Sequence, residues 1–137
     1  MRIVHQRHNN GCVVACLSML TGISYSSLFK TIYGKHKKHI EYSGLSFEKI
    51  LRILSSLGVS YRLSFDKKDM RKSKRNVMVV VDYGESPDDI FFEHSRHAVI
   101  WNAETKSVID PVPASKRKLE MTNSYCTKNF SFLIEVI

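Results

Sequence analysis

A cysteine, a histidine and an aspartate occupy positions in this sequence where they could act as a nucleophile, a base and a residue that orients the base. Cys12 opens an apolar stretch with helical periodicity, so it falls in the first turn of a predicted helix. The positive end of a helix dipole and the unpaired N–H groups there favour a thiolate over a thiol. Taken alone, Cys12 is more simply interpreted as a small buried hydrophobe, as most isolated cysteines are.

His97 and Asp110 are the candidate partners of this thiol. His97 opens the β-rich run 97–102, and Asp110 closes the next run, 107–110, just before Pro111. The polar connection 103–106 has the length of a hairpin turn, which predicts that the two runs pair antiparallel. The two side chains would then lie at the same open end, within hydrogen-bond reach, as a base and its orienting residue require. Taken alone, His97 is more simply interpreted as a histidine at the end of a strand, and Asp110 as an aspartate that starts a turn.

Gln6 is a fourth candidate, six residues before Cys12 in a polar segment that is expected to turn at residues 9–11. Its amide could fold back beside the thiol. An amide N–H there, together with the backbone N–H of Cys12, would form an oxyanion hole. A glutamine in a loop indicates nothing by itself, so its interpretation depends on the other three residues.

The elements that must position these residues follow a simple order. With 137 residues and a mass of 15.8 kDa, the chain is expected to form a single domain over residues 1–137. Apolar periodicity predicts helices at 12–20, 24–32 and 46–57, and β-rich runs follow at 59–65, 77–83, 97–102, 107–110 and 130–137. Helices first and strands later predict an α+β fold, with N-terminal helices packed on an antiparallel β-sheet.

Composition excludes several classes of protein. The chain is 43% hydrophobic and 25% charged, as in an ordinary globular protein, and it is not of the disordered class. No apolar run approaches the roughly 20 residues of a membrane span. The N-terminus lacks a small-residue cleavage site, and three cysteines are too few for a disulfide scaffold. We therefore expect a cytoplasmic protein, or an effector delivered without a cleavable signal peptide.

The formal charge of +8 suits an anionic partner but does not establish one. The basic runs 35–38 and 67–75 are more simply solvated loops, and no aromatic residue interrupts the second run, as stacking on single strands would require. Nucleic acid is thus left open but not favoured. The acidic segment 85–93 could border the active site and favour a basic peptide, although a solvated loop is again the simpler interpretation.

The four candidate residues also lie within a resemblance to a known family. The segment 6–20, with Gln six residues before Cys and an Ala-Cys-Leu within the helix, resembles the catalytic opening of the bacteriocin-processing double-glycine leader peptidases. The similarity continues in order through nearly the whole chain, at Gly44-Leu45-Ser46, Leu57-Gly58-Val59, His97-Ala98-Val99-Ile100, Asp110-Pro111 and a tail from Lys118 through a short helix to Phe132-Leu133-Ile134.

This resemblance implies a papain-like cysteine peptidase fold that needs no cofactor. By position, Cys12 would be the nucleophile, His97 the base, Asp110 the orienting residue and Gln6 the oxyanion donor. Two departures flank the nucleophile, because Gly11 and Val13 stand where the family usually has Asp and Gly. The transporter that usually follows the peptidase in this family is absent from this sequence.

The sequence therefore predicts a cysteine peptidase that acts on a peptide or protein substrate. The same triad could instead carry out deamidation or acyl transfer in a bacterial toxin or effector, including one acting on RNA, because such reactions share a thioester intermediate. A peptide-binding module with a silent triad is a further alternative. A zinc site from Cys12, Cys16, His94 and His97 is not favoured, because the spacing matches no common structural site and Cys16 fits the apolar stripe.

Overall fold

The fold joins three helices to a five-stranded sheet in the order that the sequence predicts. The computed structural model describes residues 1–8, 11–34, 45–84, 95–117 and 119–137. The helices α1 (Cys12–Thr21), α2 (Tyr25–Tyr33) and α4 (Phe47–Ser56) come first, and each agrees closely with its predicted range. The strands that follow are β1 (Tyr61–Ser64), β2 (Val77–Gly84), β3 (Ser95–Asn102), β4 (Ser107–Ile109) and β5 (Phe130–Val136).

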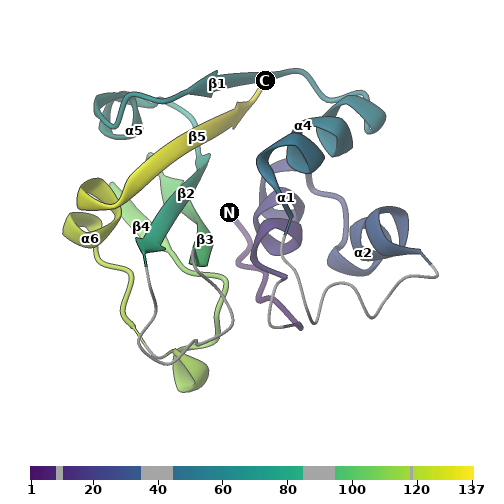
Figure 1. Cartoon of the computed structure of the whole chain (residues 1–137), viewed down its shortest axis with the longest axis horizontal. Coiled ribbons are helices and arrows are strands. Elements are labelled where there is room, and N and C mark those ends of the chain that lie inside the picture. The colour runs from purple at the N-terminus through teal and green to yellow at the C-terminus, as the bar shows by residue number, and fades with distance from the viewer. Residues whose placement is uncertain (9–10, 35–44, 85–94, 118) are drawn as a thin grey trace.

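The sheet is antiparallel throughout, with the strand order β1-β5-β2-β3-β4 (Figure 1). The C-terminal strand β5 therefore lies between β1 and β2, which ties the end of the chain into the interior of the sheet. The predicted hairpin of β3 and β4 is confirmed, and Ile100 pairs with Ile109 in it.

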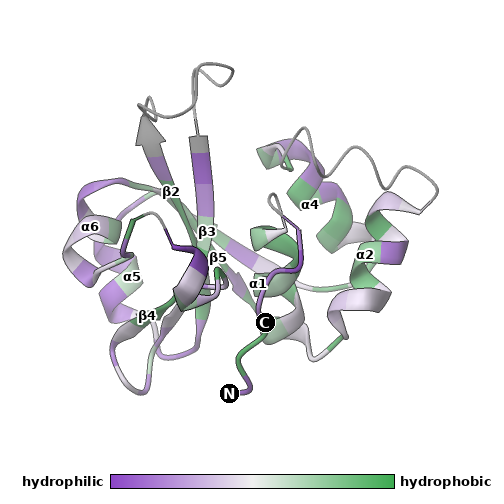
Figure 2. Ribbon diagram, turned by 90° about the horizontal axis from the view of Figure 1, so that it is seen from below, coloured by the Kyte–Doolittle hydropathy of each residue, from purple (hydrophilic) through white to green (hydrophobic). Residues whose placement is uncertain are grey.

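Side chains alternate between two buried layers because successive residues of a strand point to opposite faces. On one face, Met78 and Val80 of β2 pack into a core shared with α1, α2 and α4. On the other face, Val79 and Val81 pack with two short helices, α5 (Lys68–Lys72) and α6 (Asn123–Lys128). Figure 2 shows the sheet between these two groups of helices.

Helix α1 lies closer to the centre of the molecule than its periodicity predicts. A single buried face was expected, but Val14, Ala15, Cys16 and Leu17 are all fully buried, so the expectation of one buried face is wrong. The helix packs against both α2 and β3, and contacts on several sides leave no polar face. Gly22 ends it in the left-handed region at φ 77°, which allows the sharp turn into α2.

Two further segments differ from the prediction. The basic stretch 67–75 was expected to be a surface loop, but it contains α5, whose Met70 is fully buried. Cys126 lies in a segment expected to be polar, yet on α6 it is fully buried beneath the sheet. The expected loops at 35–38 and 85–93 lie outside the described residues. Among the helices that the structure describes, none is long and apolar enough to cross a membrane.

Candidate active site

Cys12 is the first residue of α1 and lies beside strand β3. Gly11 caps the helix, and the Cys12 side chain is partly buried. The thiol hydrogen-bonds the imidazole of His97 and the backbone of Ala98 and Val13. The sulfur therefore combines a helix N-terminus with a basic side chain, which is an environment that stabilises a thiolate.

His97 and Asp110 are brought together by the hairpin of β3 and β4. Strand β4 pairs with residues 100–102 of β3 and ends at Ile109. Continuing this register by one residue places Asp110 opposite Val99, and residues opposite each other lie on the same face of the sheet. His97 lies two residues from Val99 and therefore shares that face. The Nε2 atom of His97 lies 2.8 Å from Oδ1 of Asp110, and both residues are buried. The sequence-based prediction of this pair is borne out in its geometry.

Asp110 is itself held by the turn that follows β4. Its Oδ1 also accepts a hydrogen bond from the backbone N–H of Val112 at 3.0 Å. Arg117 donates from Nε to the Val112 carbonyl at 2.9 Å and from a terminal nitrogen to the Asp110 carbonyl at 3.3 Å. Its Nε also lies 3.7 Å from Oδ2 of Asp110. Arg117 was not predicted from the sequence, because no local pattern indicates that its side chain folds back over this turn.

Gln6 lies near the same turn, because its backbone N–H donates to the carbonyl of Pro111 at 2.9 Å. Its side-chain Nε2 donates to the carbonyl of His8 at 3.0 Å. The N-terminal segment is thus fastened to the residue that follows Asp110, and the bond to His8 fixes the plane of the Gln6 amide.

Burial and mutual contact shift the pKa values of the three residues in a consistent direction. Burial alone would raise the pKa of Cys12, but its hydrogen bond to His97 and the imidazolium charge outweigh burial and lower the pKa. Burial would lower the pKa of His97, but Asp110 and Cys12 raise it to about 9. Burial would raise the pKa of Asp110, yet His97, Val112 and Arg117 hold it below its usual value. These shifts favour a thiolate, an imidazolium and a carboxylate together.

The other two cysteines are in a different chemical state. Burial raises the pKa of Cys16 well above its usual value and that of Cys126 to about 12, so both remain thiols. Among the described residues no three histidine, cysteine or acidic side chains converge as metal ligands. Of the four residues weighed as zinc ligands, His94 lies outside the described part of the chain.

Gly11, one of the two departures from the family pattern, is explained by its neighbour Tyr25. A Cβ atom at Gly11 would collide with the Tyr25 hydroxyl. That hydroxyl accepts a hydrogen bond from the backbone N–H of Arg7 at 3.2 Å and hydrogen-bonds Nδ1 of His8 at 2.9 Å. The residue before the nucleophile must therefore lack a side chain for Tyr25 to hold the preceding segment.

The papain-like class of thiol proteases is defined by helices packed on an antiparallel sheet. Its nucleophilic cysteine starts the first helix and lies beside a strand that carries the histidine. The model of the Peptidase C39 family matches residues 1–134, so the chain belongs to that family and is a papain-like cysteine peptidase. The resemblance to the double-glycine leader peptidases is thereby confirmed.

A solved structure supports the same fold. The chain is similar to the peptidase domain of Streptococcus ComA, a bi-functional ABC transporter involved in a quorum sensing pathway. The two share 17% sequence identity and superpose with a TM-score of 0.59, covering 97% of this chain and 95% of the other. No curated protein matches the chain.

Proposed function

We propose that residues 1–137 act as one catalytic domain that hydrolyses a peptide bond with Cys12 as nucleophile, His97 as acid and base, and Asp110 as the residue that orients His97. The observation that carries this proposal is the buried 2.8 Å hydrogen bond from His97 to Asp110 beside the thiol of Cys12. With Nε2 engaged by Asp110, Nδ1 is the ring nitrogen left to face the sulfur.

The chemistry follows from this arrangement. The Cys12 thiolate attacks the carbonyl carbon of the scissile bond, and His97 then protonates the leaving amine, which leaves a thioester on Cys12. Water, deprotonated by His97, hydrolyses the thioester and restores the pair. Asp110 keeps the imidazole in one orientation and stabilises its positive charge through both events.

Gln6 would stabilise the negative oxygen of the tetrahedral intermediates. A primary amide carries two N–H groups in one plane, and the bond from Nε2 to His8 fixes the orientation of that plane. Together with the backbone N–H of Cys12, at the start of α1, this amide would supply the oxyanion hole. The backbone bond from Gln6 to Pro111 holds this donor in register with the Asp110 turn.

The other reactions weighed from the sequence also pass through a thioester, but deamidation differs in the amide that Cys12 attacks, and acyl transfer differs in the group that attacks the thioester. Deamidation releases ammonia from a side-chain amide, and acyl transfer uses an amine in place of water. Four alternatives from the sequence stay predictions: a toxin or effector role, action on RNA, peptide binding with a catalytically inactive triad, and a cytoplasmic location.

Product analysis tests the proposal and separates these reactions. A library of peptides from a digested proteome is incubated with the protein and with Cys12→Ser, and products are identified by mass spectrometry. We expect new peptide termini with the unaltered protein only. Cys126→Ala, which removes a buried cysteine of α6 that remains a thiol, is the matched control and should retain cleavage.

Each outcome has a distinct meaning. A mass increase of about 1 Da at Gln or Asn without new termini would replace hydrolysis by deamidation, and linked peptides would indicate acyl transfer. Cleavage that persists in Cys12→Ser would contradict the role of the thiol.

A further inference from the structure

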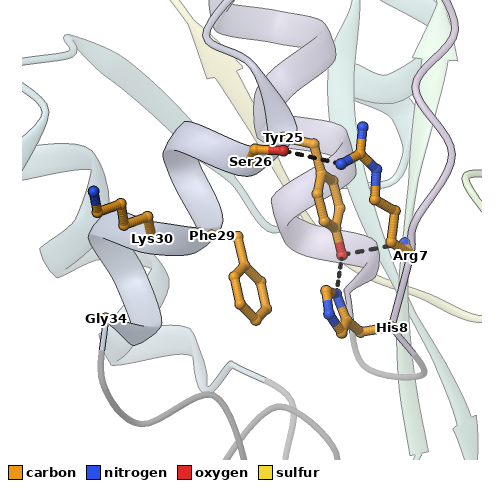
Figure 3. Close-up of a pocket in the computed structure, with 7 residues that line it drawn as sticks. All are labelled: Arg7, His8, Tyr25, Ser26, Phe29, Lys30 and Gly34. Atoms are coloured by element: carbon orange, nitrogen blue, oxygen red, sulfur yellow. Dashed lines mark hydrogen bonds between the residues drawn. The ribbon is translucent and has the colours of Figure 1, made fainter.

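A second feature of the molecule is a pocket beside the N-terminal segment. A pocket of about 630 Å³ opens between the N-terminal segment and α2. It is lined by Arg7, His8, Tyr25, Ser26, Phe29, Lys30 and Gly34 (Figure 3). The Tyr25 hydroxyl on its wall packs against Gly11, which is joined directly to Cys12.

One side of the pocket is formed by aromatic rings. The imidazole of His8 stacks on Phe29 with ring centroids 4.3 Å apart and an angle of 10° between the planes. Tyr25 lies nearly parallel to Phe29 at 6.3 Å, and its hydroxyl bond to His8 fixes the arrangement. Such a wall is suited to the methylene groups of a side chain, because flat apolar faces gain from excluding water.

The rim of the pocket carries two cations. The Arg7 guanidinium lies 5.4 Å from the centre of the Tyr25 ring and donates to Ser26 Oγ at 2.9 Å, which holds it over the pocket. Lys30 also lines the pocket, one turn of α2 beyond Ser26, and Tyr25 and Phe29 lie between it and Arg7 (Figure 3). None of the ion pairs between described residues includes Arg7 or Lys30. An apolar wall with a cation on either side matches a ligand with a methylene stem and an anionic end.

We propose that this pocket receives a glutamate or aspartate side chain of the peptide substrate, close to the bond that Cys12 attacks. The inference deepens the proposed function and rests on it. A peptide advances about 3.3–3.6 Å per residue, so a chain with its carbonyl at Cys12 brings nearby side chains within reach of this pocket. An acidic substrate also suits a protein with a formal charge of +8.

Protection of Cys12 from iodoacetamide tests this pocket without knowledge of the cleavage site. Three acetylated hexapeptides alternate glycine with Glu, Gln or Lys, so that the variable residue falls at several distances on either side of the thiol. The rate of Cys12 alkylation is measured by intact mass against peptide concentration. Each protein variant is compared with its own rate in the absence of peptide.

The Glu peptide should protect at a concentration about tenfold lower than the Gln peptide, which corresponds to about 1.4 kcal/mol. The preference should fall below about threefold in Arg7→Gln/Lys30→Gln. It should persist in Lys67→Gln/Lys68→Gln, which removes the same charge at exposed positions on the other face of the sheet. Added salt should weaken the preference, because both cations are exposed.

Equal protection by the Glu and Gln peptides, or a preference retained in Arg7→Gln/Lys30→Gln, would overturn the proposal. Stronger protection by the Lys peptide than by the Glu peptide would also overturn it, and this is the result expected if the acidic segment 85–93 binds a basic peptide. Stronger protection by a short single-stranded RNA would overturn it as well. Failure of the proposed function is seen separately, because alkylation without peptide would then not depend on His97.

Discussion

The Nε2 atom of His97 lies 2.8 Å from Oδ1 of Asp110, and the two residues are 6% and 7% exposed. In so buried a position a charged pair is stable only when each group is satisfied. The imidazole meets this requirement through Asp110 and Cys12, and the carboxylate through His97, Val112 and the guanidinium of Arg117. The ionisation of the Cys12 thiol therefore depends also on Val112 and Arg117, which contact Asp110.

Replacement of Asp110 measures how much this support contributes. Asp110→Ala should lower kcat/KM by about 10²- to 10⁴-fold, because His97 loses both its orientation and the charge that raises its pKa. Asp110→Asn should lose less, since its amide oxygen can still accept the His97 N–H, as in the Cys-His-Asn arrangement of papain-like proteases. Cleavage kinetics with a peptide found by the library experiment would show this order. Activity of Asp110→Ala within twofold of the unaltered protein would exclude the role of Asp110.

Gln6 is expected to act only in steps that develop an oxyanion. Gln6→Ala should lower kcat by about 10²- to 10³-fold, while alkylation of Cys12 by iodoacetamide stays unchanged, because alkylation forms no tetrahedral oxyanion. Gln6→Glu, which keeps the size but removes the N–H donors, should behave alike. A parallel fall in both rates would instead show that Gln6 merely supports the local structure.

Arg117 is expected to be a positioning residue, since it contacts the carbonyls of Asp110 and Val112 rather than the thiol. Arg117→Ala should lower kcat/KM on the order of tenfold and raise the pKa of Asp110, seen as a shift of the acidic limb of the activity profile to higher pH. Arg62→Ala is the matched control, because Arg62 pairs with Glu135 at 2.7 Å across β1 and β5. An unshifted pH profile in Arg117→Ala would leave Arg117 with only a structural role.

The contact between Gly11 and Tyr25 is expected to limit substitution before the nucleophile. Gly11→Ala should lower the free energy of unfolding by about 1–3 kcal/mol, because the new methyl group collides with the Tyr25 hydroxyl. In a Tyr25→Phe background the loss should be smaller, since the hydroxyl is gone. Urea unfolding of the four proteins gives this coupling as a double-mutant cycle. Additive losses would mean that the two residues do not interact.

The sequence predicts the His97 and Asp110 pair because a short hairpin fixes its geometry locally. Four residues join the two runs, so the strand-end residues have little freedom once the strands pair. The placement of Cys12 could be inferred in the same way, from the start of an apolar helix. Tertiary packing of α1 on β3 brings Cys12 to His97. In the sequence, only the family resemblance indicated that these two residues meet.

Other features depend on contacts that no local pattern encodes. Met70 is the only apolar residue of α5, so a stretch rich in lysine gave no helical signal although that one side chain is fully buried. Arg117 resembles any surface arginine in the sequence, and its role depends on the path of the turn after Asp110. The burial of α1 on several sides likewise depends on the position of α2. The apolar pattern of α1 itself, over ten residues, does not contain that information.

The pH dependence of Cys12 alkylation tests the central claim most directly. A lowered thiol pKa keeps thiolate present as pH falls, and a His97 pKa raised to about 9 keeps the imidazolium until the pH rises through that value. Intact-mass labelling with dilute iodoacetamide from pH 5 to 8 should therefore modify Cys12 alone, and at pH 5 and 6 it should do so faster than a free thiol is modified.

In His97→Ala the rate at pH 5 and 6 should collapse, because burial then dominates and raises the thiol pKa. Cys12→Ser should show no labelling of the native protein. A rate in the unaltered protein that climbs about tenfold per pH unit, as for a free thiol, with label spread over Cys16 and Cys126, would contradict an activated thiolate and imidazolium pair.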